Sequence, residues 1–145
     1  MEVEIRRLGP GDDEAVRAAA DLFDKPPEAE ATQRFLGEPS HHLLMAFSGG
    51  SPVGFVSGVE LTHPDKGTEM FLYELSVDPA ARRRGVGRQL VKTLAELARN
   101  RGNYGMWVLA DDDNEAARAT YARAGGREAS RPLMIEWTFA ALPPL

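Results

Sequence analysis

The chain has 145 residues, of which 43% are hydrophobic and 27% are charged, and it carries a net charge of −5. These values are typical of one globular domain, so we expect a single domain over residues 1–145 and exclude a disordered or collagen-like chain. The negative charge disfavours general nucleic-acid binding, which requires a basic face. The absence of cysteine excludes disulfides, cysteine-based zinc sites and a cysteine nucleophile. Apolar runs too short to cross a membrane and an acidic N-terminus predict a cytoplasmic protein.

The first part of the chain predicts one short strand and two helices. Val3 and Ile5 alternate with charged residues, as they would in a half-buried strand. The next segment predicts a helix that Asp12 or Asp13 can cap and that the Lys-Pro-Pro sequence at residues 25–27 ends. The apolar residues of this helix recur at helical spacing, at Ala15, Val16, Ala19, Leu22 and Phe23. A second, short helix is predicted over residues 28–36.

Three strands are predicted next, over residues 43–47, 53–61 and 70–77. The Ser-Gly-Gly-Ser sequence at residues 48–51 is typical of a hairpin turn, and His-Pro-Asp-Lys-Gly at residues 63–67 ends the second strand. The clearest helix of the sequence follows, because one stripe of it is apolar, at Val86, Leu90, Leu94 and Leu97.

The last part of the chain alternates strands and helices. A strand is predicted over residues 106–110, a helix over residues 114–124 that Gly125 and Gly126 close, and a final strand over residues 133–139. The whole order is then β-α-α-β-β-β-α-β-α-β. Hairpins followed by strand–helix alternation predict an α/β fold of the mixed α+β kind, with helices on the faces of a mixed sheet.

Four arginines lie within seven residues of this acidic chain, between a predicted strand and the clearest helix: Arg82, Arg83, Arg84 and Arg88. Gly85 and Gly87 in the same loop leave the backbone accessible to a ligand, and the first N–H groups of a helix have no partner within it. A helix N-terminus beside arginines is well suited to a pyrophosphate, although a solvated basic turn is the simpler alternative. The sequence has no P-loop and no Gly-x-Gly-x-x-Gly after its first strand.

The Arg82-x-x-Gly85-x-Gly87 pattern resembles the acetyl-coenzyme A signature of the GNAT superfamily of N-acetyltransferases. The Leu-Ser-Val-Asp-Pro segment at residues 75–79 is similar to the strand that precedes this signature in the family. A later helix is also similar, through Asn114, Ala117 and Tyr121. The resemblance implies a GNAT fold over nearly the whole chain, with a central, mixed, mostly antiparallel sheet of six or seven strands and about four flanking helices. One departure is Gly126, where the family usually has Phe and where we expect a changed packing contact.

The same resemblance implies acetyl-coenzyme A as the cofactor. The main chain of residues 75–77 would pair with the pantetheine arm and leave one amide for the thioester oxygen. Tyr121 would stand near the thioester sulfur, and its reference pKa of about 10 keeps the phenol protonated at neutral pH, ready to protonate the leaving thiolate. Two alternatives stay open, namely Tyr121 as a core aromatic and Asn114 as a simple helix cap. The cofactor-binding residues implied are Leu75, Ser76, Val77, Arg82, Arg83, Arg84, Gly85, Val86, Gly87, Arg88, Asn114, Ala117 and Tyr121.

Glu74 is the candidate base. It lies on the predicted strand beside the proposed thioester, and alternation places it on the opposite face from Tyr73 and Leu75. A carboxylate there can accept the proton of an attacking amine, directly or through water, or hold a cationic substrate. An exposed strand carboxylate without a function is the alternative. Because no cysteine is present to carry the acyl group, we expect direct attack of the amine in a ternary complex.

Residues 73–77, Tyr-Glu-Leu-Ser-Val, resemble the Tyr-Asp-Leu-Ala-Val segment of GNAT-type aminoglycoside 3-N-acetyltransferases. Residues 20–24, Ala-Asp-Leu-Phe-Asp, are similar to the N-terminal region of those enzymes. This resemblance implies a small polycationic acceptor, an aminoglycoside acetylated on its 3-amino group, and hence antibiotic resistance. The substrate-binding residues implied are Tyr73, Glu74, Asp111, Asp112 and Asp113. Because GNAT proteins are often dimers, we also expect a homodimer.

Other interpretations of the chain stay open. The acceptor is alternatively a protein N-terminus, a lysine, a polyamine or another small amine, and a third interpretation is a coenzyme A-binding module without turnover. Ligand-induced stabilisation with no thiol release would favour that module. No metal site is predicted, because His41 and His42 on a strand point to opposite faces and no His-Glu-x-x-His sequence is present.

Overall fold

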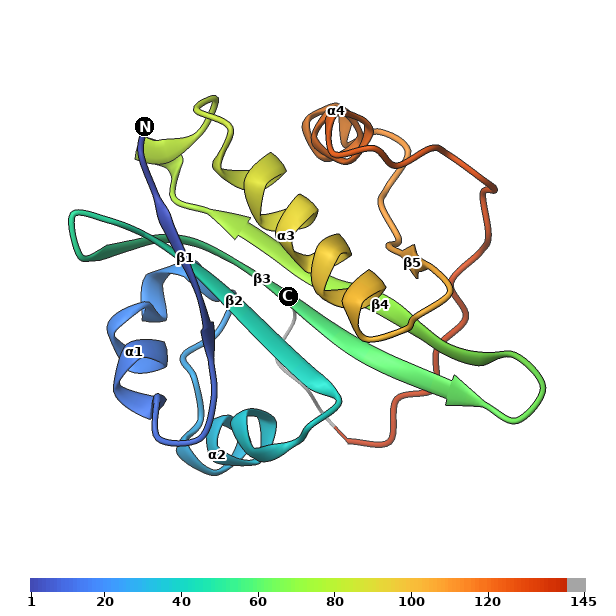
Figure 1. Ribbon diagram of the computed structural model, residues 1–145, viewed down its shortest axis with the longest axis horizontal. Coiled ribbons are helices and arrows are strands. Elements are labelled where there is room, and N and C mark those ends of the chain that lie inside the picture. The colour runs from blue at the N-terminus through green and yellow to red at the C-terminus, as the bar shows by residue number, and fades with distance from the viewer. Residues whose placement is uncertain (141–145) are drawn as a thin grey trace.

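The computed structural model describes residues 1–140, in which five strands form one sheet in the order β1-β2-β3-β4-β5 (Figure 1). The first four strands pair antiparallel, and β5 lies parallel to β4. The strands are β1 (Glu4–Leu8), β2 (His41–Ser48), β3 (Ser51–His63), β4 (Gly67–Val77) and β5 (Met106–Trp107). The mixed, mostly antiparallel sheet that the sequence predicted is confirmed.

Helices cover both faces of the sheet (Figure 1). One face carries the early helices, and the other carries α3 with α4 packed beside it. The helices are α1 (Asp13–Ala18), the 3-10 turn η1 (Ala20–Leu22), α2 (Ala29–Gly37), the 3-10 turn η2 (Pro79–Ala81), α3 (Val86–Asn100) and α4 (Glu115–Arg123). The first predicted helix thus divides into α1 and η1, while the other three lie where the sequence places them.

Two clusters of buried residues fix these layers. On the α3 face, Val86, Leu90 and Leu94 of the predicted stripe are buried against Val56 and Leu72 of the sheet. On the other face, residues of α1 and α2 pack on alternate residues of β2 and on Phe55 of β3. Both faces of the central strands are therefore covered, which explains why their sequences are apolar almost throughout.

The last part of the chain differs from the expectation. The strand predicted over residues 106–110 is only two residues long, and the strand predicted over residues 133–139 is wrong, because that segment is irregular and 73% to 94% exposed at Leu133, Ile135, Trp137 and Phe139. The sheet of residues 1–140 consequently has five strands in place of six or seven. Alternating apolar residues indicate a strand, but a strand also requires a neighbouring edge, and the sequence pattern does not supply one.

A buried polar network ties the sheet to the loop after α3. His42 is fully buried, its Nδ1 accepts from the Arg7 guanidinium at 2.8 Å, and its Nε2 donates to Glu60 at 2.7 Å. Arg101 Nε and Asn103 Nδ2 donate to the same carboxylate, at 2.6 and 2.9 Å. Because Arg7 donates to one ring nitrogen, the imidazole is held neutral with its proton on the other.

This network makes stability depend on pH. Burial lowers the pKa of His42, so its contribution to the free energy of unfolding is complete above the unfolded pKa of 6.5 and is lost as the pH falls toward the lowered folded value. Burial by itself raises the pKa of Glu60, but the hydrogen bonds from Asn103, His42 and Arg101 outweigh it and leave the pKa lowered. The Glu60 contribution is therefore lost at more acidic pH, below the unfolded value of 4.5.

Replacing Glu60 by Ala is expected to lower the free energy of unfolding at pH 7.5 by about 3 kcal/mol, because it leaves buried donors without an acceptor. The matched control is Glu4→Ala, since the Glu4 side chain is 73% exposed and lies 3.7 Å from Arg6. That exposed pair should contribute less than about 1 kcal/mol. Urea denaturation measures both, and equal losses in the two variants would show that the network does not stabilise the sheet.

Candidate active site

A β-bulge on β4 sets the position of Glu74. Gly58 of β3 lies opposite Leu72, and the preceding Ser57 lies opposite Glu74, so Tyr73 is an extra residue in β4. Two residues of β4 therefore share one position of the ladder. The simple alternation that placed Tyr73 and Glu74 on opposite faces breaks at this point.

The segment after η1 covers the part of β4 that carries Glu74. Ser76 Oγ donates to the Leu22 carbonyl at 2.7 Å, and the Phe23 ring stacks on Phe55 at 4.3 Å. The next residue, Asp24, shares a side-chain hydrogen bond with Glu74. Burial, with the charge and the hydrogen bond of Asp24, raises the pKa of Glu74 to about 7. A carboxyl group with this pKa can both hold and accept a proton at neutral pH.

Aromatic side chains lie next to Glu74 at the edge of the sheet. Phe71 stacks on Trp107 of β5 at 4.4 Å and meets Tyr73 edge to face at 5.9 Å. Tyr73 is 67% exposed. These rings offer a flat apolar surface beside the carboxyl pair, which suits the ring of a small acceptor or the face of a cation.

The edge of β4 is open along residues 72–77. Among residues 1–140, β5 pairs only with Met70 and Phe71 of β4. Leu75 and Val77 pack their side chains on the α3 face, and the Ser76 hydroxyl donates to the Leu22 carbonyl. The open edge of β4 at these three residues therefore consists of main chain. An open strand edge of this kind can pair with an extended ligand that carries amide groups.

The arginine loop follows directly from this edge. Asp78 caps η2 by accepting from the Ala80 amide at 2.8 Å, and Arg82 Nε donates to the Val77 carbonyl at 3.3 Å. Arg83 and Gly85 have left-handed φ angles of 63° and 81°, and Gly85 precedes the first turn of α3. Arg82, Arg83, Arg84 and Arg88 are exposed, and in residues 1–140 none of them pairs with a carboxylate. The structure therefore places the four arginines together around the N-terminus of α3, and their role in binding an anion stays a prediction.

The two loop glycines have different roles in the structure. Gly85 stands in open space and is required for its positive φ. Gly87 lies where α3 approaches α4, and an added Cβ would meet Thr120 Cγ2 at 3.3 Å. Close helix packing is therefore a second reason for Gly87, besides the ligand access that the sequence indicated.

Helix α4, which carries Tyr121, packs beside α3 (Figure 1). Asn114 caps this helix by accepting from the Ala117 amide at 3.1 Å, which confirms the capping role. Tyr121 packs its half-buried ring on the α3-face core, and burial raises the pKa of its hydroxyl. The phenol therefore keeps its proton at neutral pH. Gly126, at the expected departure, donates its amide to the Tyr121 carbonyl at 2.9 Å.

The acidic loop before α4 is exposed at Asp111, Asp112 and Asp113. Its main-chain carbonyls accept hydrogen bonds from within the loop and from α4, and the Asp112 carboxylate lies 3.5 Å from Arg131. The role of these aspartates toward an acceptor stays a prediction.

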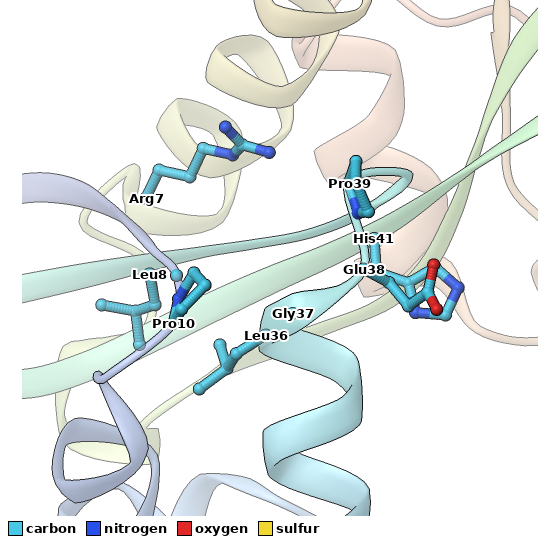
Figure 2. A pocket seen from close by; sticks show the side chains of 9 residues that line it. Arg7, Leu8, Pro10, Leu36, Gly37, Glu38, Pro39 and His41 are labelled. Atoms are coloured by element: carbon cyan, nitrogen blue, oxygen red, sulfur yellow. The ribbon is translucent and has the colours of Figure 1, made fainter.

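Two other features lie away from this site. His41 and His42 point to opposite faces as predicted, His41 toward Phe35 and His42 into the polar network. A pocket of about 280 Å³ lies between the end of β1 and the end of α2, with Leu8, Pro10 and Leu36 on one side and Pro39 and His41 on the other (Figure 2). Its lining includes none of the predicted cofactor-binding, substrate-binding or catalytic residues. No helix within residues 1–140 is long and apolar enough to cross a membrane.

Sequence reasoning missed Asp24 as a site residue. Its only signal was its place directly after Leu22 and Phe23, two residues that the helical pattern marks for burial. Contact between Asp24 and Glu74, which are 50 positions apart (74 − 24), depends on how that segment docks on β4.

Residues 12–126 match the sequence profile of the acetyltransferase (GNAT) family. The chain is 35% identical over 108 residues to N-alpha-acetyltransferase RimI of Mycobacterium tuberculosis, a match that covers 73% of this chain and 66% of RimI. It is also 35% identical over 114 residues to mycothiol acetyltransferase of Salinispora tropica, a match that covers 74% of this chain and 35% of that protein. The chain thus spans just under two thirds of the first relative and about a third of the second.

Solved structures share the fold over almost the whole chain. An aminoglycoside acetyltransferase from an uncultured soil metagenomic sample superposes with a TM-score of 0.81 at 27% identity, covering 95% of this chain and 100% of that one. A second enzyme of that description, solved in complex with sisomicin, superposes with a TM-score of 0.87 at 19% identity, covering 95% and 97%. The second likeness shows the fold alone.

Proposed function

The chain belongs to the acetyltransferase (GNAT) family, and from this premise we propose that it transfers an acetyl group from acetyl-coenzyme A to a primary amine of a small polycationic acceptor, with aminoglycosides as the acceptor class. One observation carries the proposal. The open edge of β4 begins beside the Glu74 carboxyl and ends at the arginine loop. A single strand therefore connects a group suited to an amine with a group suited to a pyrophosphate.

The residues of this edge and loop fit acetyl-coenzyme A, the cofactor of the family. Bound there, the cofactor supplies a reactive acetyl thioester. The free N–H groups at the start of α3 and the exposed arginines would hold its pyrophosphate. The main chain of residues 75–77 would bind its extended, amide-bearing arm. Asn114 and Ala117 would support this site through the capped first turn of α4.

Glu74 would accept a proton from the attacking amine, and Tyr121 would donate a proton to the leaving group. An amine must be neutral to attack, and Glu74, with a pKa of about 7, can accept its proton at the carboxylate. Tyr121 holds a proton at its hydroxyl, since burial raises the pKa of that group, and can donate it where negative charge develops.

Four features support an aminoglycoside acceptor. The net charge of −5 attracts a polycation, and the Asp24–Glu74 pair offers carboxylates for ammonium groups. Tyr73 is exposed beside this pair and can face a sugar ring. The solved acetyltransferase that is 27% identical is described as an aminoglycoside enzyme. The 3-amino group as the acetylated position, and resistance as the consequence, belong to this proposal.

A protein N-terminus is the second candidate acceptor. The specific observation in its favour is the 35% identity to RimI over 73% of this chain. A peptide whose only cation is its N-terminal ammonium group would leave one carboxylate of the Asp24–Glu74 pair without a cation. An aminoglycoside carries further ammonium groups, and this difference separates the two candidate acceptors.

Release of free thiol from acetyl-coenzyme A, measured against several aminoglycosides, spermidine and short peptides, tests the proposal. We expect release with aminoglycosides, and mass spectrometry would then locate the acetyl group. Release with peptides alone would replace the acceptor and keep the transferase. Cofactor binding without release from any amine would indicate a binding module without turnover.

We propose further that the chain forms a homodimer. The support is the exposed apolar side chains of residues 133–139, of which Trp137 is 74% and Phe139 94% exposed. Light scattering after gel filtration should give twice the mass of the chain for the wild type and a lower mass for Ile135→Asp with Trp137→Asp. A monomeric wild type would contradict this.

The cytoplasmic location stays a prediction, which cell fractionation would test.

A further inference from the structure

We propose that Asp24 is a second acceptor-binding carboxylate, which acts with Glu74 as one site for the ammonium groups of a cationic acceptor. This inference rests on the proposed function and names the chemistry that selects its acceptor. The sequence and the family match assign no role to Asp24.

The position of Asp24 is fixed from both sides. Before it, Phe23 is anchored on Phe55 and the Leu22 carbonyl accepts from Ser76, two residues along β4 from Glu74. After it, Pro26 and Pro27 restrict the backbone before α2 begins. The Asp24 side chain is therefore held over β4 by contacts that do not depend on a ligand, while the residue remains exposed to solvent.

The charge that acts on Glu74 within residues 1–140 is negative. The charged group recorded against Glu74 is Asp24, the residue opposite it on β3 is Ser57, and Tyr73 is its neighbour in the bulge. Burial and the nearby Asp24 raise the pKa of Glu74 to about 7, so at neutral pH about half of the molecules keep a proton on the Glu74 carboxyl.

An ammonium group can replace that proton. In the free protein, the protonated form of Glu74 shares its hydrogen bond with Asp24. When a cationic amine enters, Glu74 loses its proton to solvent, and the N–H groups of the ammonium donate to both carboxylates. No covalent bond other than the O–H of Glu74 breaks, and charge balances because one cation enters as one proton leaves. An acceptor with two ammonium groups should bind more tightly than an acceptor with one. Its first ammonium group can stay on Asp24 while the second amine reacts beside Glu74.

Carboxyl-detected NMR titration of Glu74 tests the pair without turnover. We expect a midpoint at about pH 7 in the wild type and a lower midpoint in Asp24→Asn, which removes the charge and keeps the size. Asp21→Asn is the matched control, since Asp21 is an exposed carboxylate on η1 and should leave the midpoint unchanged. Saturating kanamycin should lower the wild-type midpoint to about pH 6 or below and should have a smaller effect in Asp24→Asn.

Kinetics supply the second readout. Asp24→Asn should raise the KM for kanamycin about tenfold, and change kcat and the KM for acetyl-coenzyme A by less than about twofold. Asp21→Asn should change none of these. If Asp24→Asn behaves like Asp21→Asn in both the titration and the kinetics, the inference is overturned. If no amine releases thiol, the proposed function fails, while the response of Glu74 to kanamycin still decides whether the pair binds an ammonium group.

Discussion

Replacing Tyr121 by Phe is expected to lower kcat for thiol release about 100-fold and to leave the affinity for acetyl-coenzyme A within about twofold. The reason is that only the hydroxyl is lost. The ring of Tyr121 packs on the α3-face core, and Phe keeps that packing. Burial raises the pKa of the hydroxyl, so in the wild type it is a proton donor over the whole neutral range.

Stopped assays of thiol release and calorimetric titration of acetyl-coenzyme A measure the two quantities separately. Tyr104→Phe is the matched control, because Tyr104 is exposed and its hydroxyl bonds to Glu69 away from the arginine loop. Its kcat should equal that of the wild type. Wild-type turnover in Tyr121→Phe would remove the acid role and leave Tyr121 as a core aromatic.

Replacing Arg82, Arg83 and Arg84 together by Ala is expected to weaken coenzyme A binding about 100-fold. In residues 1–140 these side chains have no carboxylate partner, so a bound pyrophosphate would not have to displace one. Because they are exposed, salt should weaken binding to the wild type more than binding to the triple variant. Stability should change little, since Ala81 and Val86, which anchor the loop at both ends, are buried and remain.

Calorimetry at two salt concentrations measures this effect. The control is Arg34→Ala with Arg99→Ala and Arg127→Ala, which removes the same charge from exposed positions outside the loop. A general electrostatic attraction would weaken binding equally in both triple variants. A local anion site predicts a loss confined to the Arg82–Arg84 variant.

Much of the fold follows from the sequence because its elements have local causes. The Gly49-Gly50 turn has positive φ at both residues, 56° and 82°, which glycine adopts without strain, and it fixes the β2–β3 hairpin. The stripe of α3 and the cap at Asn114 are also local, since each depends on residues within one or two helical turns. The arginine loop was predictable for the same reason, because its cations and glycines are neighbours in sequence.

The tertiary structure alone decided the features that need two distant segments. Alternation along β4 was interrupted by the bulge at Tyr73, which depends on register with β3. The apolar residues at 133–139 read as a strand, yet they form none, because pairing requires an edge that the pattern does not contain. The groups around His42 also come from across the fold, since Arg7 and Glu60 bond to its ring and Arg101 and Asn103 bond to Glu60.

The sequence by itself determined which residue types could bind an anion, hold a proton and form the sheet, because those properties belong to side chains and to short-range spacing. It did not determine the proton affinity of Glu74. That quantity depends on desolvation and on the carboxylate of Asp24, and both arise only when the segment after η1 folds onto β4.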